Sequence, residues 1–398
     1  MDAFCRTFLF MDSLQKHTLR LRMKKNILLI ANSEWYLLNF RKDLLERLYE
    51  QKFNVILFYP YDKEPNQHLQ KSFTIHRSPL QRGKLSLRNL FSFLHIFKKI
   101  ISKEKPDLIN AFGLQASVLL AISNFFFRVP CILSITGLGY TFLSNQFLAI
   151  SIRKFLRLSS KFFFRRKYVS FIFQNNEDLK IFNEYGLILN RNAYLIFGSG
   201  VDTSFFYPNT KKEKKHYLNF LFSARLIKDK GINETLTAFK KIRDQYHETV
   251  LTITGDIDDL NPSSLSSSEL DRLKAIKGVR YLGHVKNIKE IYDSVDIVVL
   301  PSYREGLSRV LIEAASCGLP IITSNAPGCR DVVEDNKNGF LVEAGSAHEI
   351  YVAMQKFHDN PSLISNFGKF SREIAISKFS SAKINQETIT VYNHLLQL

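Results

Sequence analysis

PSYREGLSRVLIEAASCGLP, residues 301–320, is the stretch that decides the fold of this 398-residue chain. The apolar run Ile297–Leu300 comes directly before it and has the length and character of a buried strand. Residues 307–317 have helical spacing, and the glycine and proline that follow end the helix. The run Pro320–Ser324 then predicts a second strand. A strand, loop, helix and strand in this order are typical of a parallel α/β sheet.

Two carboxylates lie on this unit. Glu305 is in the loop beside the helix N-terminus, and Glu313 lies about two turns into the helix. A helix N-terminus offers unpaired backbone N–H groups and a partial positive charge, which favour a phosphate. We therefore interpret the unit as a nucleotide-sugar site in which Glu305 reaches sugar hydroxyls and Glu313 accepts hydrogen bonds from a ribose. The alternative is that both are solvated surface acids.

The composition indicates a globular chain of two domains. Its length exceeds that of a single typical core, and its 45% hydrophobic and 23% charged residues are ordinary globular values. The four cysteines are scattered and form no CxxC pair. This argues against a disulfide framework or a zinc site and fits a reducing cytosol.

The net charge of +18 is unevenly distributed. Residues 1–200 hold 30 Lys and Arg against 13 Asp and Glu, whereas residues 201–398 hold 25 against 24. In segments 87–105 and 152–168, basic residues are interleaved with Phe and Leu. Such segments predict basic amphipathic helices on an anionic membrane surface, with ordinary packing helices as the alternative. No nucleic-acid-binding motif accompanies the charge, so no nucleic-acid partner is expected.

Membrane-spanning and targeting segments are not expected. No uncharged apolar run approaches the ~18 residues of a transmembrane helix. Residues 1–22 lack the basic start, apolar core and cleavage site of a signal peptide. We interpret residues 1–23 as an N-terminal extension, with Met23 as an alternative natural start. The expected location is cytoplasmic, peripheral on the inner face of the cell membrane.

The first half opens as a βαβ unit. Asn26–Ala31 predicts a strand, Leu37–Glu50 a helix and Asn54–Phe58 the next strand. The first loop has no GxGxxG, which argues against a dinucleotide-dependent oxidoreductase. Further along, Cys131–Ile135 predicts a strand that leads into the loop TGLG, residues 136–139. Its two glycines allow a ligand to approach the backbone closely.

The second half repeats the strand and loop pattern. Asn219–Ser223 predicts a strand, and Arg225 and Lys230 lie in the loop after it. Open α/β sheets bind ligands at this end of their strands, although a solvated basic loop is the alternative. Gly283 and Val285 follow another predicted strand and are interpreted as the pocket for a nucleotide base.

Asp256 and Asp258 invite a metal interpretation, because carboxylate oxygens are ligands for divalent cations. Their place after the mid-domain strand Leu251–Thr254 matches a turn instead. No metal site is therefore predicted.

Several of these motifs together resemble the retaining glycosyltransferases of family 4. The resemblance rests on Glu305 and Glu313 with their flanking residues, on the TGLG loop, on GSGVD at 198–202, and on the arginine and lysine after the predicted strand. The motifs follow the family's order from about Lys24 to the C-terminus. The resemblance implies the α/β fold class GT-B, in which two doubly wound Rossmann-like domains face a central cleft.

The resemblance also implies a division of labour between domains. Residues 24–210 are expected to bind the acceptor and face the membrane, and residues 217–375 are expected to bind the nucleotide sugar. Residues 376–398 are expected to form a terminal helix that can cross back to the first domain.

Roles for single residues follow from the same resemblance. Arg225 and Lys230 would hold the donor diphosphate and stabilise the departing nucleoside diphosphate, and Glu305 would position the sugar. Glu313 would bind the ribose. The remaining implied contacts are loop contacts, to the donor by Gly306, Leu307, Ser308, Gly283 and Val285, and to the acceptor by Gly137, Gly139 and Arg41.

The implied activity is transfer of a hexose or N-acetylhexosamine from a UDP-sugar, with retention and without a metal or cofactor. The implied acceptor is a saccharide linked to undecaprenyl diphosphate, as in bacterial assembly of lipopolysaccharide O-antigen, capsule polysaccharide or glycoprotein glycans. No carboxylate is identifiable as a covalent nucleophile, so front-face substitution is expected. The alternatives are a non-hydrolysing UDP-sugar 2-epimerase, a basic nucleic-acid-binding protein and a catalytically inactive scaffold.

Overall fold

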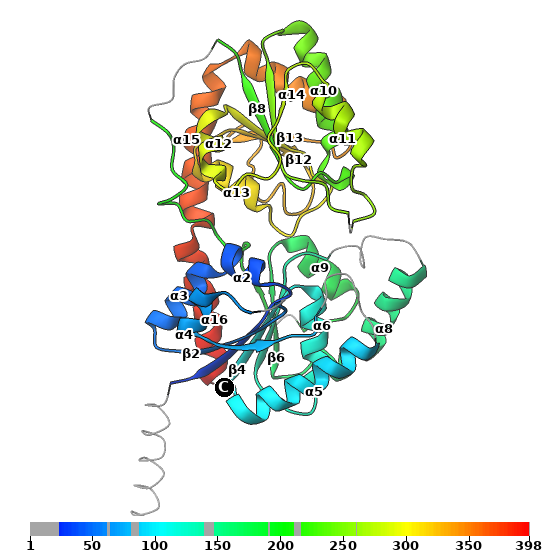
Figure 1. Ribbon diagram of the computed structural model, residues 1–398, viewed down its shortest axis with the longest axis vertical. Helices are drawn as coiled ribbons and strands as arrows, with labels where there is room; N and C mark the ends of the chain where they lie inside the picture. Colours follow the sequence, from blue (N-terminus) through cyan, green and yellow to red (C-terminus); the bar gives the residue numbers. More distant parts are fainter. Residues whose placement is uncertain are drawn as a thin grey trace, which may run out of the picture. The chain divides into compact units, whose positions relative to one another are not determined.

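The protein is built on two sheets of parallel type with helices packed around each (Figure 1). The computed structural model describes residues 24–61, 64–80, 87–138, 147–189, 192–210, 216–259 and 261–397. Helices connect most of the successive strands in both sheets, as in doubly wound folds, whereas residues 325–338 join the last two strands of the second sheet without a helix. The predicted α/β class is confirmed.

The first sheet has seven strands in the order β3-β2-β1-β4-β5-β6-β7. Its central strands β4, β5 and β6 are buried along their whole length, as expected for parallel strands covered on both faces. The strands are β1 Asn26–Ile30, β2 Asn54–Tyr59, β3 Thr74–Arg77, β4 Leu108–Phe112, β5 Cys131–Ile135, β6 Val169–Phe173 and β7 Ala193–Leu195. The helices between them are α2 Glu34–Phe40, α3 Lys42–Glu50, α4 Gln67–Ser72, α5 Leu87–Glu104, α6 Leu114–Ser123, α8 Phe147–Phe163 and α9 Asn176–Glu184.

The single helix predicted over Leu37–Glu50 is wrong, because two helices, α2 and α3, meet at Arg41. Arg41 has φ −127° and ψ 5°, which is not helical geometry. Its side chain points inward at this break, with the guanidinium 4.5 Å from the ring centroid of Phe112. Helical periodicity in the sequence cannot detect a break of one residue that keeps the apolar positions on the same side.

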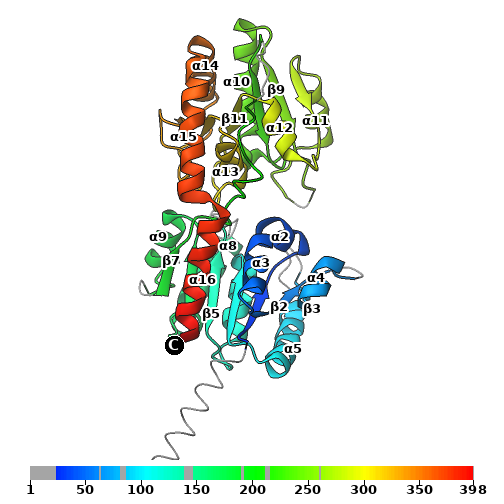
Figure 2. The same ribbon diagram turned by 90° about the vertical axis from the view of Figure 1, so that its left-hand side faces the viewer.

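The second sheet has six parallel strands in the order β10-β9-β8-β11-β12-β13. Figure 2 shows α15 on one side of this sheet and α11 on the other. The strands are β8 Asn219–Ser223, β9 Val250–Thr254, β10 Val279–Tyr281, β11 Ile297–Leu300, β12 Ile321–Ser324 and β13 Gly339–Val342. The helices are α10 Ile232–Gln245, α11 Ser267–Lys274, α12 Ile288–Ser294, α13 Arg309–Ser316, α14 Ala347–Asp359, α15 Ser362–Phe379 and α16 Ser381–Gln397, with a 3-10 turn at Lys228–Lys230.

The stretch of residues 301–320 folds as predicted into a loop and a helix between two neighbouring strands, β11 and β12. The helix α13 begins two residues later than expected, because Ser308 is extended and serves as its N-cap. Residues 311–316 of α13 are all buried, so most of its length is inside the molecule. The loop of residues 301–308 therefore ends at a helix that is packed inside the molecule.

The chain divides into two compact units, one up to Leu133 that also includes Tyr392–Leu398, and one of Ser134–Val391. Within the first unit, Asn110 on β4 donates a 2.6 Å hydrogen bond to the hydroxyl of Tyr392. The end of the chain thus packs beside the first strands of the molecule. The predicted boundaries at residues 210 and 217 stay a prediction.

Candidate functional site: loops at the carboxyl edge of the second sheet

The loops after β8 and β9 pack tightly against each other. The Ala224 amide donates to the Thr254 carbonyl at 3.1 Å. Gly255 has φ +115°, and a Cβ there would lie 1.9 Å from the Ala224 carbonyl oxygen. Only glycine allows this approach, because any side chain would collide with the neighbouring backbone. The close packing fixes where Arg225, the next residue of the first loop, begins.

Arg225 forms an ion pair with a carboxylate that the sequence did not assign to it. Its Nη1 donates to Oδ2 of Asp258, in the loop after β9. The Arg225 side chain is 45% exposed, whereas that of Asp258 is 10% exposed. The largely buried Asp258 carboxylate therefore binds one N–H group of the guanidinium, and the exposed part of the Arg225 side chain is accessible to a ligand.

Lys230, the second predicted cation, lies at the end of the 3-10 turn after β8 and pairs with Glu305. Its Nζ donates to Glu305 Oε1, and both side chains are largely buried. The next residue, Gly231, has φ +74°, and a Cβ there would lie 2.5 Å from the Pro301 carbonyl oxygen. This glycine lets the β8 loop close on the β11 loop, so the structure brings together a predicted cation and a predicted carboxylate from distant parts of the sequence.

The turn of Glu305 to Ser308 is tied to the loop after β12. The Glu305 amide donates to the Pro327 carbonyl at 2.9 Å, and the Ser308 amide donates to the Gly328 carbonyl at 3.1 Å. The Ser308 N–H therefore already has an acceptor within the protein, and the donor contact that the resemblance implies for Ser308 stays a prediction. The amides of Gly306 and Leu307 have no acceptor within the described ranges. They are the ones left for a ligand at this turn.

Glu313 is buried in α13 rather than solvated. Tyr292 donates its hydroxyl to Oε2 at 3.1 Å, and Arg309 donates Nε to Oε1 at 2.6 Å. Burial raises the pKa of Glu313, and the Arg309 guanidinium opposes that rise. The alternative of a solvated helix acid is therefore wrong. The predicted ribose contact stays a prediction, and it would have to share an oxygen that already accepts a protein hydrogen bond.

Gly283 and Val285, the predicted base pocket, lie in the loop after β10. The Gly283 carbonyl accepts a 2.8 Å hydrogen bond from the Gly255 amide, so this loop is tied to the one after β9. Tyr281 donates its hydroxyl to the Gly255 carbonyl at 3.1 Å, which is a second hydrogen bond between β10 or its loop and the loop after β9. The loops that follow four neighbouring strands thus meet at one edge of the sheet, where ligands bind in open α/β sheets.

The predicted acceptor residues lie outside this sheet. Arg41 is 5% exposed and donates Nε to the Tyr36 hydroxyl at 3.1 Å, so the alternative of an exposed surface arginine is wrong. Gly137 follows β5 with φ +134°, a conformation that favours glycine. Gly139 lies outside the described residues. Contacts of these residues with an acceptor stay predictions.

Sequence reasoning missed Asp258 as the partner of Arg225 and Tyr292 as a partner of Glu313. The signal for Asp258 was present, because the Asp256-x-Asp258 pair stood out as a possible metal site. In the described part of the chain no group of three or more His, Cys, Asp or Glu is placed to hold a metal ion. The second aspartate has an arginine as its partner instead.

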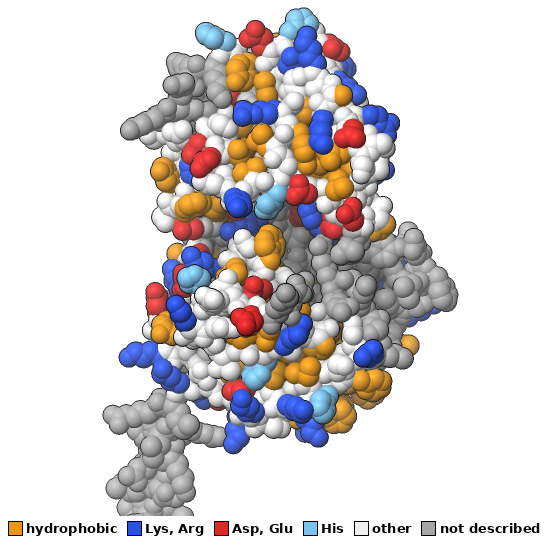
Figure 3. Space-filling model, viewed as in Figure 1, with side chains coloured by type: hydrophobic (Ala, Val, Ile, Leu, Met, Phe, Trp, Pro, Cys, Tyr) orange, Lys and Arg blue, Asp and Glu red, His pale blue; other side chains and the backbone are white. Residues whose placement is uncertain are grey.

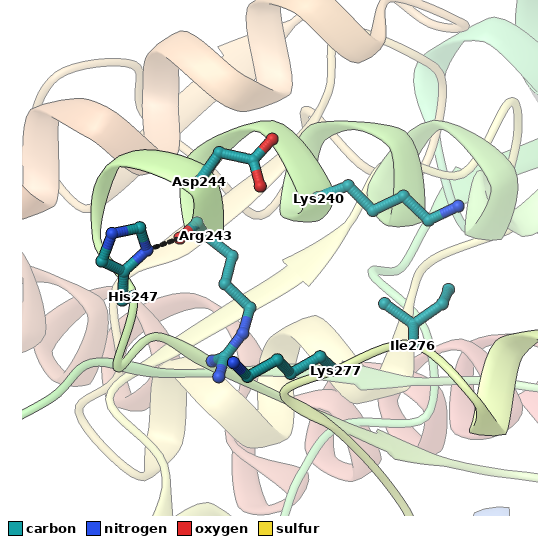
Figure 4. Close-up of a pocket in the computed structure, with 6 residues that line it drawn as sticks. All are labelled: Lys240, Arg243, Asp244, His247, Ile276 and Lys277. Carbon is teal, nitrogen blue, oxygen red and sulfur yellow. Dashed lines mark hydrogen bonds between the residues drawn. The ribbon is translucent and has the colours of Figure 1, made fainter.

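A cavity of about 390 Å³ elsewhere on the second unit contains none of the predicted donor residues (Figure 4). Its Arg243 donates Nη1 to the Thr249 carbonyl, and His247 Nδ1 lies 3.2 Å from the Arg243 carbonyl oxygen. The side chains of Arg243 and His247 are thus paired with nearby backbone carbonyls. The side chains that line the cavity come from α10, the turn after it and the segment before β10, namely Lys240, Arg243, Asp244, His247, Ile276 and Lys277.

Comparison with known proteins identifies the architecture. A family model described as glycosyl transferases group 1 matches residues 204–374, and one described as glycosyl transferase 4-like matches residues 26–171. The chain therefore contains a glycosyl transferase 4-like domain followed by a glycosyl transferases group 1 domain. The solved structure of a sucrose-phosphate synthase from Thermosynechococcus elongatus superposes with a TM-score of 0.77 and 19% identity, covering 94% of this chain and 100% of that one. The fold of this glycosyltransferase is GT-B, as predicted.

Curated relatives of this glycosyltransferase align over most of its length. A capsular polysaccharide biosynthesis glycosyltransferase of Staphylococcus aureus, CapM, is 27% identical over 336 residues, which are 81% of this chain and 85% of the relative. A UDP-Gal:alpha-D-GlcNAc-diphosphoundecaprenol alpha-1,3-galactosyltransferase of Escherichia coli is 25% identical over 353 residues, which are 85% of this chain and 88% of the relative. Both are similar to this glycosyltransferase along both halves of the fold.

Proposed function

We propose that the enzyme transfers a hexose or N-acetylhexosamine from a UDP-sugar, with retention, to a saccharide linked to undecaprenyl diphosphate. The proposed setting is assembly of a bacterial surface polysaccharide such as capsule or O-antigen. The observation that carries the proposal is that two ion pairs, Arg225 with Asp258 and Lys230 with Glu305, lie in the loops at the carboxyl edge of the second sheet. The names of the aligned relatives supply the donor, acceptor and pathway class.

The two cations suit a diphosphate leaving group. An arginine has five N–H donors and a lysine has three, so each can bind phosphate oxygens while it keeps its carboxylate partner. The negative charge on the leaving diphosphate grows as the bond to the sugar breaks, and fixed cations stabilise that charge. Glu305 is held by Lys230 and tied by its amide to the Pro327 carbonyl, so it offers its second oxygen to sugar hydroxyls from a fixed position.

The proposed reaction is a front-face substitution without a metal. The acceptor oxygen forms a bond to the anomeric carbon on the face from which the diphosphate leaves. The bond between that carbon and the diphosphate oxygen breaks, and its electron pair goes to the diphosphate. The proton of the acceptor hydroxyl goes to a leaving phosphate oxygen, so that the products are UDP and an α-glycoside.

An assay of UDP release tests this proposal. Purified enzyme is incubated with UDP-Gal, UDP-Glc, UDP-GalNAc or UDP-GlcNAc, each with and without undecaprenyl-diphosphate sugars, and the product anomer is identified by NMR. We expect release that depends on the lipid-linked acceptor and a product with an α-linkage. Activity with a soluble sugar and none with the lipid acceptor would refute the proposed acceptor. A free epimer formed without any acceptor would identify a 2-epimerase instead.

We further propose that the enzyme rests on an anionic membrane surface through α8. Leu158 is 79% exposed and Phe162 is 57% exposed, and they lie one turn apart on this helix. Lys154 and Lys161 are exposed on the same side. Figure 3 shows that hydrophobic side chains and Lys or Arg side chains are also exposed close together elsewhere on the elements of the first sheet. Exposed apolar and cationic groups on one helix face suit an interfacial helix.

None of the described helices is long and apolar enough to cross a membrane. Vesicle binding measures the proposed attachment through α8. We expect the double variant Leu158→Ser/Phe162→Ser to bind phosphatidylglycerol-containing vesicles about tenfold more weakly than the wild type, because it loses the apolar area that would enter the bilayer.

The matched control for this measurement is Phe370→Ser, which removes a 48% exposed phenylalanine from α15. It should leave binding unchanged. Equal binding by the double variant and the wild type, or equal binding of the wild type to vesicles of phosphatidylcholine alone, would contradict this docking surface.

A further inference from the structure

Backbone hydrogen bonds join the segment that contains Asp256 and Asp258 to the loop after β8, the predicted diphosphate loop. The Leu226 amide donates to the Asp256 carbonyl at 2.8 Å, and the Leu265 amide donates to the Leu226 carbonyl at 2.9 Å. The Lys228 amide donates to the Ser263 carbonyl at 2.8 Å. Backbone hydrogen bonds at Asp256, Ser263 and Leu265 therefore join this segment to the β8 loop.

The backbone of Asp258 is held within this segment by two hydrogen bonds. Its amide donates to Oγ of Ser264 at 2.9 Å, and its carbonyl accepts from the Asn261 amide at 2.7 Å. Its carboxylate lies against Arg225 with only 10% of the side chain exposed. The largely buried Asp258 carboxylate thus binds the guanidinium of Arg225, whose side chain is 45% exposed.

We propose that Asp258 is a positioning residue that holds the Arg225 guanidinium in the orientation that binds the donor diphosphate. This inference rests on the proposed function of the same site. A guanidinium is planar, so a carboxylate that holds one N–H restricts the directions in which the other four can point. Without this carboxylate, a half-exposed arginine would have to be ordered at the moment of binding, which costs affinity.

The test measures binding of UDP and of uridine to the full chain by calorimetry, with uridine measured by displacement of UDP if needed. We expect Asp258→Asn to weaken UDP binding about tenfold, the scale of one charge-assisted hydrogen bond. Uridine binding should stay within about twofold, because uridine has no phosphate for Arg225 to hold. Asp259→Asn is the matched control, since it removes the same charge from the exposed neighbouring residue. It should leave UDP binding unchanged.

A double-mutant cycle separates positioning from a general effect on the loop. If Asp258 acts through Arg225, Asp258→Asn should have no further effect on UDP binding in an Arg225→Met background. The same loss in both backgrounds would overturn the inference, and so would equal weakening of uridine. Tighter UDP binding by Asp258→Asn would also overturn it, because Asp258 would then compete with the diphosphate for Arg225.

The two levels of the argument fail in different ways. If the wild-type protein binds no UDP, the proposed function itself is wrong. If the wild type binds UDP and Asp258→Asn binds it equally well, only the positioning role is wrong. Thermal unfolding of every variant shows whether a change in binding accompanies a loss of structure.

Discussion

Replacing Lys230 by Met is expected to lower kcat for sugar transfer by about 10²–10³-fold, the scale seen when one preorganised charge is removed from a developing anion. Lys230 pairs with Glu305, so the variant loses both the cation proposed to bind the diphosphate and the group that holds Glu305, the carboxylate proposed to position the sugar. The measurement is the initial rate of UDP release with donor and lipid acceptor at saturation. Because the lost interaction strengthens in the transition state, kcat should fall more than KM rises.

Lys228→Met is the matched control for this variant. Lys228 belongs to the same 3-10 turn, and its Nζ lies 3.2 Å from an oxygen of Glu269 rather than at the predicted site. Its replacement should change kcat by less than about threefold, since an exposed ion pair contributes little. Equal losses in the two variants would mean that the turn, and not the Lys230 charge, supports the reaction. A normal rate in Lys230→Met would remove Lys230 from the catalytic group.

Replacing Arg309 by Met should lower the free energy of unfolding by about 3 kcal/mol, because the variant removes the cation beside the buried Glu313 carboxylate and leaves it the Tyr292 hydroxyl as a hydrogen-bond donor. Urea unfolding followed by circular dichroism measures the change. Lys180→Met is the control, because Lys180 and Glu184 form an exposed pair of the same i,i+4 spacing with a 3.9 Å separation. That variant should cost less than about 0.5 kcal/mol.

The loss in Arg309→Met should depend on pH in a defined direction. Burial raises the pKa of Glu313 from its ordinary value of 4.5, so the folded protein holds this proton more tightly than the unfolded chain. From pH 4.5 up to the raised pKa, the folded state binds more protons, and the Glu313 contribution to stability falls as pH rises. Removing the Arg309 charge raises the pKa further, so the variant should lose stability over a wider range of pH than the wild type.

A second substitution tests whether the unpaired charge causes the loss. Glu313→Gln in the Arg309→Met background removes the buried charge, and it should recover at least half of the lost stability near neutral pH. No recovery would mean that Arg309 stabilises α13 through packing. A loss that does not vary with pH would show that Glu313 does not titrate in the folded protein over that range.

The part of the fold that the sequence predicted best is the unit around α13. Its two strands are short apolar runs, and glycine and proline mark the end of its helix, so each signal is local. The same method gave one helix over Leu37–Glu50 where there are two. The break at Arg41 is made by packing against Phe112, 71 positions further along the chain, and no local pattern records that contact.

The candidate site was predictable in its composition but less so in its contacts. Arg225, Lys230 and Glu305 follow apolar runs that form strands, so their place at the carboxyl edge follows from the sequence. The acceptor for the Ser308 amide could not be predicted, because it is a carbonyl in the loop after a different strand. The burial of Glu313 was missed because its neighbour Tyr292 lies on another helix.

By itself the sequence determined the α/β class, the alternation of strands and helices, and which charged groups follow the strands of the second sheet, because these depend on residues close together in the chain. Only the tertiary structure decided that Arg225 meets Asp258, 33 residues away, and that Lys230 meets Glu305, 75 residues away. Those pairs depend on the order of β8, β9 and β11 in the sheet and on loops that close through glycine against neighbouring backbone. The physical reason is that strand order and loop packing are set by long-range contacts, and a pattern of neighbouring residues carries no record of them.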